Sequence, residues 1–410
     1  MEWKEVTLGD LCEISSSKRI FAKEYQTNGI PFYRGKEIIE KQKGNTISNE
    51  LFISRNRYEE IKAKYGVPQQ RELLLTSVGT LGVPYVIKEE EFYFKDGNLT
   101  WFRHFNGLDV EYLYYWFLSP YGKNEINAKA IGSTQKALTI DSLSKFNIKI
   151  PINLEDQRRI ASILSSLDRK IELNNKINAD LEEMAQAVFK NWFVDFEPFK
   201  DGKFVDSELG MIPEGWKVGR ADDFYQINIG KTPPRKEHKW FSNNPADKIW
   251  VSIANMGNSG IFISDSSEYL TKEAVDRHNI IMVPRNTILL SFKLTVGRVA
   301  IADKELTTNE AIARFILSDD KYMEYLYLYL KNFDYNSLGS TSSIATAVNS
   351  KTIKGMQMLQ PSDKIIDAFH IQVNPIFEKI RSLTKENSRL SLLRDTLLPR
   401  LMSGELEVPE

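Results

Sequence analysis

Cysteine is almost absent from this sequence, and its scarcity excludes two kinds of site. The single Cys12 among 410 residues rules out an internal disulfide. The histidines are too scattered to complete a metal-ligand cluster; they are His104, His238, His278 and His370. We therefore predict no metal site, and we expect Cys12 to be a small core residue.

Long apolar runs are also absent. No stretch of 18 apolar residues occurs, which argues against a membrane-spanning helix. The opening residues, MEWKE, lack the basic and then apolar pattern of an export signal. These absences predict a cytoplasmic protein that does not contact a membrane.

Recognisable catalytic motifs are missing as well. There is no Asp/Asn-Pro-Pro-aromatic tetrapeptide, which amino-methyltransferases carry, and Gly230-Lys231-Thr232 is not a P-loop because Tyr225 replaces the earlier glycine. Asp195, Glu197 and Lys200 superficially resemble a nuclease carboxylate set, but their place in a connector favours a structural turn. We predict no catalytic residues, no bound cofactor and no enzymatic activity of the chain alone.

The charge is balanced overall but unevenly distributed. The net charge is -1, yet residues 18–71 hold 12 Lys and Arg against 6 Asp and Glu, and residues 231–298 hold 10 against 6. Segment 153–197 holds 9 acids against 6 bases. Modest excesses are often only solvated surfaces. Their recurrence at matching places in the chain favours a functional role instead.

The sequence contains an internal repeat. Trp3-Lys4 returns as Trp216-Lys217, an offset of 213 residues, and further matches follow in the same order. They are Leu74-Leu75 with Leu289-Leu290, Thr80 and Gly82 with Thr295 and Gly297, Glu111 to Tyr114 with Glu324 to Tyr327, Gly132-Ser133-Thr134 with Gly339-Ser340-Thr341, and Pro151 with Pro361. This period is the size of a domain with a connector and far exceeds a solenoid unit. Two related modules imply a target with two related halves.

Each repeat predicts an α+β globular module, the first at residues 1–152 and the second at 214–361. Short β-type runs alternate with turn residues, and each module carries one aromatic helical stretch. In the first module the strands are expected at 30–33, 73–77, 85–87, 92–94 and 99–102, and the helix at 110–118. In the second they are expected at 249–253, 287–292, 299–302 and 313–317, with the helix at 323–330.

A heptad pattern follows each module and predicts two long helices. The first is expected at 153–195 and the second within the C-terminal segment 362–410. A connector at 196–213 is expected between the first helix and the second module. The first seam is Ile160, Leu164, Leu167, Ile171, Asn174, Asn178, Leu181, Ala185, Val188 and Trp192. The second is Phe369, Val373, Ile376, Ile380, Leu383, Asn387, Leu390, Arg394, Leu397 and Leu401.

A lone amphipathic helix usually packs on its own domain, but two matched helices favour an intramolecular antiparallel coiled coil. Each would extend about 55 Å at ~1.5 Å per residue and hold the modules apart. The Asn positions fix register at some cost in stability. Pro375 is expected to bend the second helix or to split off its first turns.

Several segments together resemble the specificity subunit of a Type I restriction-modification system. They are GST with 138–151, the Glu155-Asp156-Gln157 helix start, NWFVDFEPF, SELGMIPEGW and the closing LLPRLMSGEL. The resemblance spans nearly the whole chain. The second repeat departs from the pattern at its helix start, where Ile365-Ile366-Asp367 replaces the acidic-Gln signal.

The resemblance implies a non-catalytic DNA-binding protein. Two target-recognition domains would each read half of a bipartite double-stranded DNA site, and the two helices would set the spacer. Two methyltransferase subunits and translocase-nuclease (restriction) subunits would assemble around the chain. S-adenosylmethionine, ATP and magnesium would then be bound by those partners.

DNA reading needs Lys and Arg for phosphates and polar side chains for base edges. The candidates in the first module are Arg34, Lys36, Lys41, Lys43, Arg55, Arg57, Gln69, Gln70, Arg71 and Lys136. Those in the second module are Lys231, Arg235, Lys236, Lys239, Asn255, Asn258, Lys293 and Arg298. Ser77, Thr80, Thr295 and Gly297 are expected to shape a loop.

Two other functions stay open on sequence alone. A self-contained DNA methyltransferase or nuclease would act without partners, and a coiled-coil adaptor would bind no specific DNA sequence. The missing catalytic motifs weaken the first alternative. The duplicated basic modules weaken the second.

Overall fold

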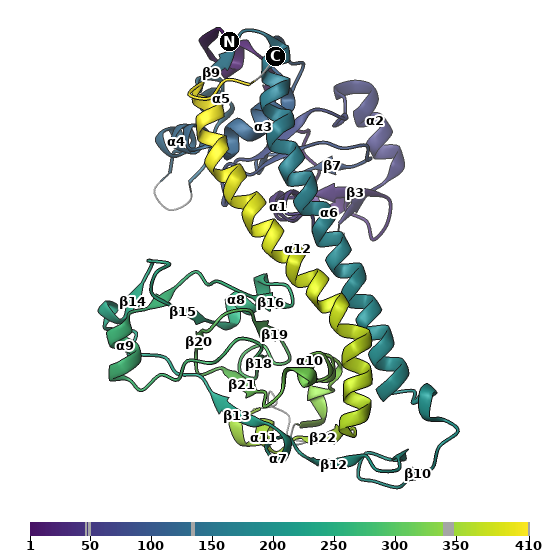
Figure 1. The fold of residues 1–410 in the computed structure, drawn as a ribbon. Helices are drawn as coiled ribbons and strands as arrows, with labels where there is room; N and C mark the ends of the chain where they lie inside the picture. Colours follow the sequence, from purple (N-terminus) through teal and green to yellow (C-terminus); the bar gives the residue numbers. More distant parts are fainter. Residues whose placement is uncertain (46, 48–50, 133–135, 339–347, 409–410) are drawn as a thin grey trace. The chain divides into compact units, whose positions relative to one another are not determined.

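The computed structural model describes residues 1–410 apart from 46, 48–50, 133–135, 339–347 and 409–410. Its contacts divide the chain into unit 1 (Met1–Leu173 and Asn387–Glu410) and unit 2 (Asn174–Glu386). Unit 1 contains the first module and unit 2 the second, and the division cuts through both long helices (Figure 1). Within the described ranges, no helix combines the length and the apolar character needed to cross a membrane.

The first module is a mixed helix and sheet fold. A sheet of order β2-β8-β5-β6 packs beside a smaller sheet β4-β3-β7, while β1 pairs with β9. The strands are β1 (Trp3–Thr7), β2 (Glu13–Ser15), β3 (Ile30–Tyr33), β4 (Phe52–Ile53), β5 (Leu73–Thr76), β6 (Pro84–Val86), β7 (Tyr93–Phe94), β8 (Leu99–Arg103) and β9 (Asn147–Pro151). The helices are α1 (Gly35–Gln42), α2 (Arg55–Tyr65), α3 (Val110–Leu118), α4 (Pro120–Lys129) and α5 (Ile140–Ser144).

The second module has the same mixed character. Its sheets have the orders β13-β21-β18-β19-β16 and β14-β17-β15-β20, and β12 pairs with β22. The strands are β12 (Lys217–Arg220), β13 (Gln226–Ile229), β14 (Phe241–Ser242), β15 (Lys248–Val251), β16 (Phe262–Ile263), β17 (Tyr269–Leu270), β18 (Ile288–Ser291), β19 (Val299–Ala302), β20 (Thr307–Thr308), β21 (Ile312–Ile316) and β22 (Gln357–Gln360). The helices are α7 (Ala221–Phe224), α8 (Ile253–Asn258), α9 (Lys272–Arg277), α10 (Met323–Asn332) and α11 (Ser350–Lys354).

The internal repeat is confirmed at the level of strand register. Each pairing in the first module recurs in the second with residues that the sequence repeat places at matching positions. The matched pairs are Lys4↔Ile150 with Lys217↔Gln360, Glu13↔Arg103 with Gln226↔Ile316, Leu73↔Phe102 with Ile288↔Phe315, and the parallel pairs Phe32↔Tyr93 with Trp250↔Thr307. A one-residue slip in a strand pair would turn every side chain to the opposite face of the sheet. The matching registers therefore show that the same side chains face the core in both modules, so the two modules share one fold. The matched triplets at 132–134 and 339–341 lie mostly outside the described residues.

The aromatic helix of each module forms part of its core. The predicted helix at 110–118 is α3, whose N-terminus is capped by the Asp109 carboxylate accepting from the Glu111 and Tyr112 N–H groups. Tyr112 donates to the Lys149 carbonyl, and Tyr325 of α10 donates to the Leu359 carbonyl at the matching place. These bonds tie the helix of each module to its terminal strand pair.

Two long helices follow the modules, α6 (Leu154–Phe193) and α12 (Asp363–Ser403). Every seam residue predicted from the heptads is buried or half-buried. In unit 2 the Asn174 amide donates to Glu386 at 2.8 Å and the Trp192 ring lies 5.7 Å from that of Phe369, so the two segments run antiparallel there. In unit 1 the Arg394 guanidinium donates to Asp168 at 2.7 Å.

Of the two effects expected of Pro375, the split does not occur, because α12 is continuous from Asp363 to Ser403, and the bend stays a prediction. Pro375 is on the exposed side of the helix, and Ile371, whose carbonyl loses its hydrogen bond, is 74% exposed. Water can therefore satisfy that carbonyl. Val373 and Phe377 are fully buried on either side of the proline and hold the helix together across it.

The connector after α6 contains regular secondary structure. It contains the 3-10 helix η3 (Glu197–Phe199) and the strand pair β10 (Phe204–Val205) and β11 (Ile212–Pro213). Asp195 accepts from the Lys190 ammonium, and Glu197 from Lys200. These local ion pairs give the carboxylates a structural role in the turn.

Candidate DNA interface

A hollow of about 590 Å³ opens on the first module where three of its segments meet. The segments are the N-terminal end of α1, the loop between β5 and β6, and the loop between β7 and β8. The lining residues are Arg34, Gly35, Lys36, Ile39, Glu40, Thr76, Val78, Thr80, Lys95 and Asn98. Three basic side chains face one acidic side chain, so the hollow attracts anions, and its hydroxyl and amide groups can hydrogen-bond.

Arg34 is fixed at the start of α1 by Glu37. The Glu37 carboxylate accepts from the Arg34 backbone N–H at 2.8 Å and from its guanidinium at 2.7 Å. Burial acts to raise the pKa of Glu37, but the hydrogen bonds from Arg34 outweigh it and lower that pKa below its usual value. The ion pair therefore persists at neutral pH, and Lys36, two residues after Arg34, is an exposed cation.

The loop between β5 and β6 is held by a hydroxyl at a matching place in both modules. Thr76 Oγ1 accepts from the Val83 N–H at 2.9 Å, and Ser291 Oγ accepts from the Arg298 N–H at 3.0 Å. Gly82 and Gly297 both have positive φ there. Sequence reasoning selected the neighbouring Ser77, Thr80 and Thr295 as loop-shaping residues and missed this hydroxyl pair.

Most other candidates in the first module are engaged in internal ion pairs. Lys41 contacts Glu90 at 2.6 Å and lies over the Tyr33 and Tyr85 rings. The remaining pairs are Lys43 with Glu40, Arg55 with Glu91, Arg57 with Glu24 and Glu60, and Arg71 with Asp109. Lys136 is exposed. These residues lie outside the lining of the hollow.

Gln69 and Gln70 lie in a different setting. They line a second hollow of about 430 Å³ together with three consecutive carboxylates, Glu89, Glu90 and Glu91, and with Lys62 and Lys88. The Gln69 amide donates to the Val67 and Pro68 carbonyls. The two glutamines therefore lie outside the basic hollow, beside charged residues of both signs.

The second module carries different chemistry at the positions that match the basic hollow. Arg34 and Ser252 are the N-caps of matching helices, so Ala254 takes the position of Lys36. Asn309 takes the position of Lys95, because each is the first residue after a matching strand. The cations are found on another segment instead. Lys231, Arg235, Lys236 and Lys239 all lie on the exposed loop that follows β13.

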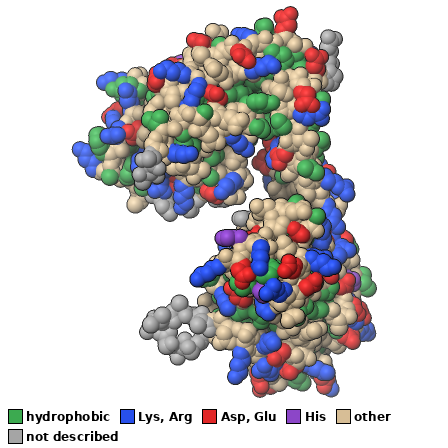
Figure 2. All heavy atoms as spheres, turned by 90° about the vertical axis from the view of Figure 1, so that its left-hand side faces the viewer, with side chains coloured by type: hydrophobic (Ala, Val, Ile, Leu, Met, Phe, Trp, Pro, Cys, Tyr) green, Lys and Arg blue, Asp and Glu red, His purple; other side chains and the backbone are tan. Residues whose placement is uncertain are grey.

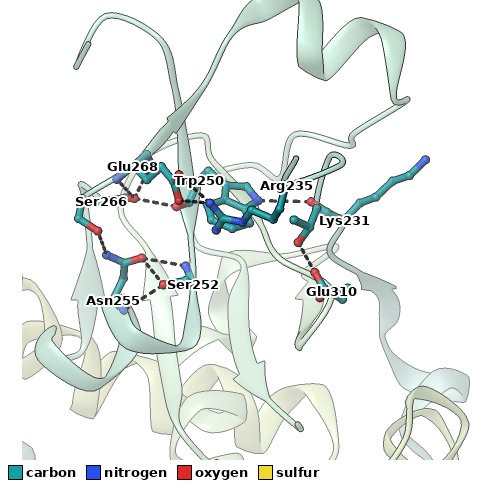
Figure 3. A network of polar contacts seen from close by, with 10 residues as sticks. Lys231, Arg235, Trp250, Ser252, Asn255, Ser266, Glu268 and Glu310 are labelled. Carbon is teal, nitrogen blue, oxygen red and sulfur yellow. Dashed lines mark hydrogen bonds and ion pairs between the residues drawn. The ribbon is translucent and has the colours of Figure 1, made fainter. Parts of the chain in front are cut away.

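Two residues of that loop, Lys231 and Arg235, contact Trp250, as Figure 3 shows. The Trp250 indole donates to the Lys231 carbonyl at 3.3 Å, and the Lys231 ammonium donates to the His278 carbonyl. The Arg235 guanidinium donates to Glu268 at 2.7 and 2.8 Å. Lys239 lies 4.3 Å from the Trp240 ring centroid and 3.6 Å from Glu237.

The last candidates of the second module lie on α8 and the loop after β18. Asn255 accepts from the Ser252 N–H and hydroxyl and donates to Ser267, so its amide caps the helix. Arg298 donates to the Ile253 carbonyl at 2.8 Å, whereas Lys293 is exposed. Asn258 belongs to α8, but its side chain lies outside the described residues.

Sequence reasoning missed Lys95 and Asn98, which reach the basic hollow from the turn before β8. The Lys-Asp-Gly-Asn turn at 95–98 was the available signal, because such turns project polar side chains. Figure 2 shows that the face it draws carries many Lys and Arg side chains with Asp and Glu side chains between them. A simple count of charge along the chain therefore could not single out the hollow.

The departure at the second helix start has a structural explanation. Gln157 is fully buried, and its side chain accepts from the Asp109 N–H and donates to the Gly107 and Pro151 carbonyls, at 2.8 to 3.0 Å. Ile366 takes the matching position in α12 and is fully buried among apolar residues. The glutamine thus fastens α6 to its own module.

Comparisons with known proteins agree on one family. The sequence model of the Type I restriction modification DNA specificity domain matches residues 1–183 and 213–370. The chain is 30% identical to the Type I restriction enzyme HindI specificity subunit of Haemophilus influenzae over 68% of this chain and 73% of that protein. It is 29% identical to the MjaIX specificity subunit of Methanocaldococcus jannaschii over 100% of this chain and 94% of that protein.

Among solved structures, the Type I restriction-modification S subunit from M. genitalium has a similar fold, with a TM-score of 0.59 at 15% identity over 98% of this chain and 96% of that one. The family match covers both modules, most of α6 and the start of α12. The chain belongs to the family of Type I restriction-modification specificity subunits, the non-catalytic DNA-recognition components of these systems.

Proposed function

We propose that this chain is the DNA specificity subunit of a Type I restriction-modification complex and that it recognises a bipartite site, with one half read by each module. The observation that carries the proposal is the repeated fold, in which every matched strand pair keeps its register while the polar side chains differ. One fold with two chemistries suits one kind of target with two different sequences.

In the first module the basic hollow is the proposed contact surface. Lys36 and Lys95 supply positive charge beside the Arg34–Glu37 ion pair, while Thr80 and Asn98 supply hydrogen-bonding groups that suit base edges. In the second module the loop 231–239 supplies the cations. The two surfaces differ in position on the shared fold, so the modules would approach DNA through different segments.

The long helices have two proposed roles. They connect the modules, so their length would set the unread spacer between the half-sites. They would also support methyltransferase and restriction subunits, which would provide the chemistry and bind S-adenosylmethionine, ATP and magnesium. The curated relatives are named as parts of Type I restriction enzymes, which supports a role in such an assembly.

Module exchange tests the bipartite reading. Residues 15–135 are replaced by those of a related specificity subunit, the chimera is expressed with the methyltransferase partner, and methylated adenines are mapped. One half of the methylated sequence should change and the other should stay. If both halves change, the modules are not independent readers.

An assay of the purified chain and the outcome of the module exchange separate the other two functions. A self-contained methyltransferase would methylate DNA when the purified chain is given S-adenosylmethionine without partners. An adaptor without DNA specificity would give no defined methylated sequence even with partners, and an exchange of modules would have no effect on the outcome.

A further inference from the structure

Arg235 stands in a short insertion that only the second module contains. The contacts Arg19–Asp96 and Thr232–Glu310 occupy matching positions in the two modules. In the first module one residue, Ile20, follows before the turn that begins at Phe21. In the second module four residues, 233–236, come before the matching turn at Glu237. The insertion adds three residues to a loop that otherwise keeps its contacts.

The Arg235 guanidinium is held in one orientation. Its Nη1 atom donates to both carboxylate oxygens of Glu268, and its central carbon lies 4.3 Å from the Phe241 ring centroid and 4.5 Å from that of Trp250. Trp250 is itself only 1% exposed. Figure 3 shows Arg235 beside the Trp250 ring, with Glu268 close by. Stacking on aromatic rings and a carboxylate partner remove most of the freedom of a long side chain.

One edge of the guanidinium remains available. The side chain is 53% exposed, and no described residue accepts a hydrogen bond from Nε or Nη2 of Arg235. Two parallel N–H donors on a planar edge match the N7 and O6 acceptors of guanine, and arginine to guanine is the commonest specific contact in the major groove. Because the side chain is already ordered, binding would lose little conformational entropy.

Glu268 distinguishes a base contact from a phosphate contact. Its carboxylate offsets the charge of Arg235 and would repel a phosphate oxygen brought to the same place. A neutral guanine edge carries no such penalty. Lys236, which is exposed in the same insertion, suits a phosphate better because a flexible ammonium acts as a point charge.

We propose that Arg235 reads a guanine in the half-site recognised by the second module and that Glu268 is the positioning residue that holds it for this contact. The inference rests on the proposed function, because it assigns a base to one of the two half-sites. It makes Arg235 a specificity-determining residue of the second module only.

The test is methylation mapping in cells that express the chain with its methyltransferase partner. The variants are Arg235→Lys, which keeps the charge and loses the planar fork, Arg235→Ala, Glu268→Gln, and the control Lys236→Gln. Both Arg235 variants should lower the preference for guanine at one position of one half-site by about 10-fold or more. Glu268→Gln should relax the same position less, and Lys236→Gln should leave the sequence unchanged.

Several outcomes would overturn the inference. They are a second half-site without a G·C pair, an unchanged sequence with both Arg235 variants, and relaxation in both half-sites. Exchange of residues 15–135 identifies which half-site belongs to which module. Thermal unfolding checks that each variant is folded. If Arg235→Ala does not fold, the guanine preference of the Arg235→Lys variant alone decides whether the inference holds. Failure of the wild-type complex to methylate any bipartite sequence would instead contradict the proposed function.

Discussion

Arg381 of α12 and Asp303 of the second module form an ion pair in which both side chains are almost completely buried, with 3.4 Å between Nε and Oδ1. Arg381 also donates to the Asn286 amide oxygen at 2.8 Å. Burial lowers the pKa of Arg381. The pair anchors the α12 segment of unit 2 to the sheet of its own module.

Removing one partner of this pair should destabilise the protein strongly. Asp303→Asn leaves the buried guanidinium without its buried carboxylate, because its other carboxylate partner, Glu378, is half exposed, and this costs about 3 to 5 kcal/mol of unfolding free energy. Arg285→Gln is the matched control, because Arg285 contacts the same carboxylate but is 50% exposed. That change should cost less than about 1 kcal/mol. Denaturant unfolding measures both variants, and equal effects would contradict the assigned role of burial.

Gln157 and Ile366 allow a reciprocal exchange at matching positions. Gln157→Ile would leave the Asp109 N–H and two carbonyls unpaired inside unit 1, and should cost at least about 2 kcal/mol of unfolding free energy. Ile366→Gln would bury an amide in a cluster of apolar side chains, which offer it no hydrogen bond, and should cost a similar amount, about 2 kcal/mol. Glu155→Gln, in the exposed first turn of α6, serves as the control and should be nearly neutral. Stability retained by either exchange would show that the position tolerates both residues.

These cases show what the sequence could predict. The periodic and aromatic segments were predicted closely: 110–118 is α3, 299–302 is β19, and every heptad position is buried or half-buried. Such patterns depend on local spacing alone. The helix α1 was not predicted, because it is short and begins after Arg34, a residue that rarely caps a helix.

The binding surface was harder to predict than the fold. Arg55, Arg57 and Arg71 resemble Lys36 in sequence, but their partners Glu91, Glu24 and Asp109 lie tens of residues away along the chain. Only tertiary contacts reveal which cations are already paired. For the same reason the meeting of Lys36 with Lys95 in one hollow could not be read from spacing.

The basic hollow gives a prediction about salt. Lys36→Gln or Lys95→Gln should weaken DNA binding by the complex similarly for all sequences, and each should reduce the slope of log affinity against log salt by about 0.9 if that lysine contacts one phosphate. Lys145→Gln is the control, since Lys145 pairs with Asp141 outside the hollow. Titrations at several salt concentrations measure the slopes. Unchanged slopes for both hollow variants would remove the phosphate role.

Glu324 gives a prediction about pH. It is fully buried at the start of α10, and burial raises its pKa despite the hydrogen-bonding contact with His370 at 2.8 Å. Between its unfolded and folded pKa values the native state binds more protons, so the free energy of unfolding falls as pH rises through that window, by at most about 1.4 kcal/mol per pH unit.

Glu324→Gln removes this group from the titration and keeps a polar side chain beside His370. The variant should therefore gain stability relative to the wild type as pH rises from the unfolded pKa of a glutamate toward the raised folded value. Thermal unfolding of both proteins across that range measures the difference. A difference that stays constant with pH would show that Glu324 does not carry the dependence.

The spacer role of the helices gives the last prediction. A seven-residue insertion after Leu173 in α6, together with one after Glu386 in α12, lies where the two units divide. It would lengthen the pair of helices by about 10 Å at ~1.5 Å per residue and would keep each seam residue facing its partner. Since base pairs are stacked about 3.4 Å apart, the methylated sequence should keep both half-sites and gain a spacer about three base pairs longer.

Loss of methylation with intact folding would mean that the partner subunits no longer reach both target bases. A four-residue insertion in each helix is the control, because it shifts the seam by a stutter and should impair folding or assembly. Full methylation of the original spacer by the seven-residue variant would remove the ruler role and leave the helices as a docking platform.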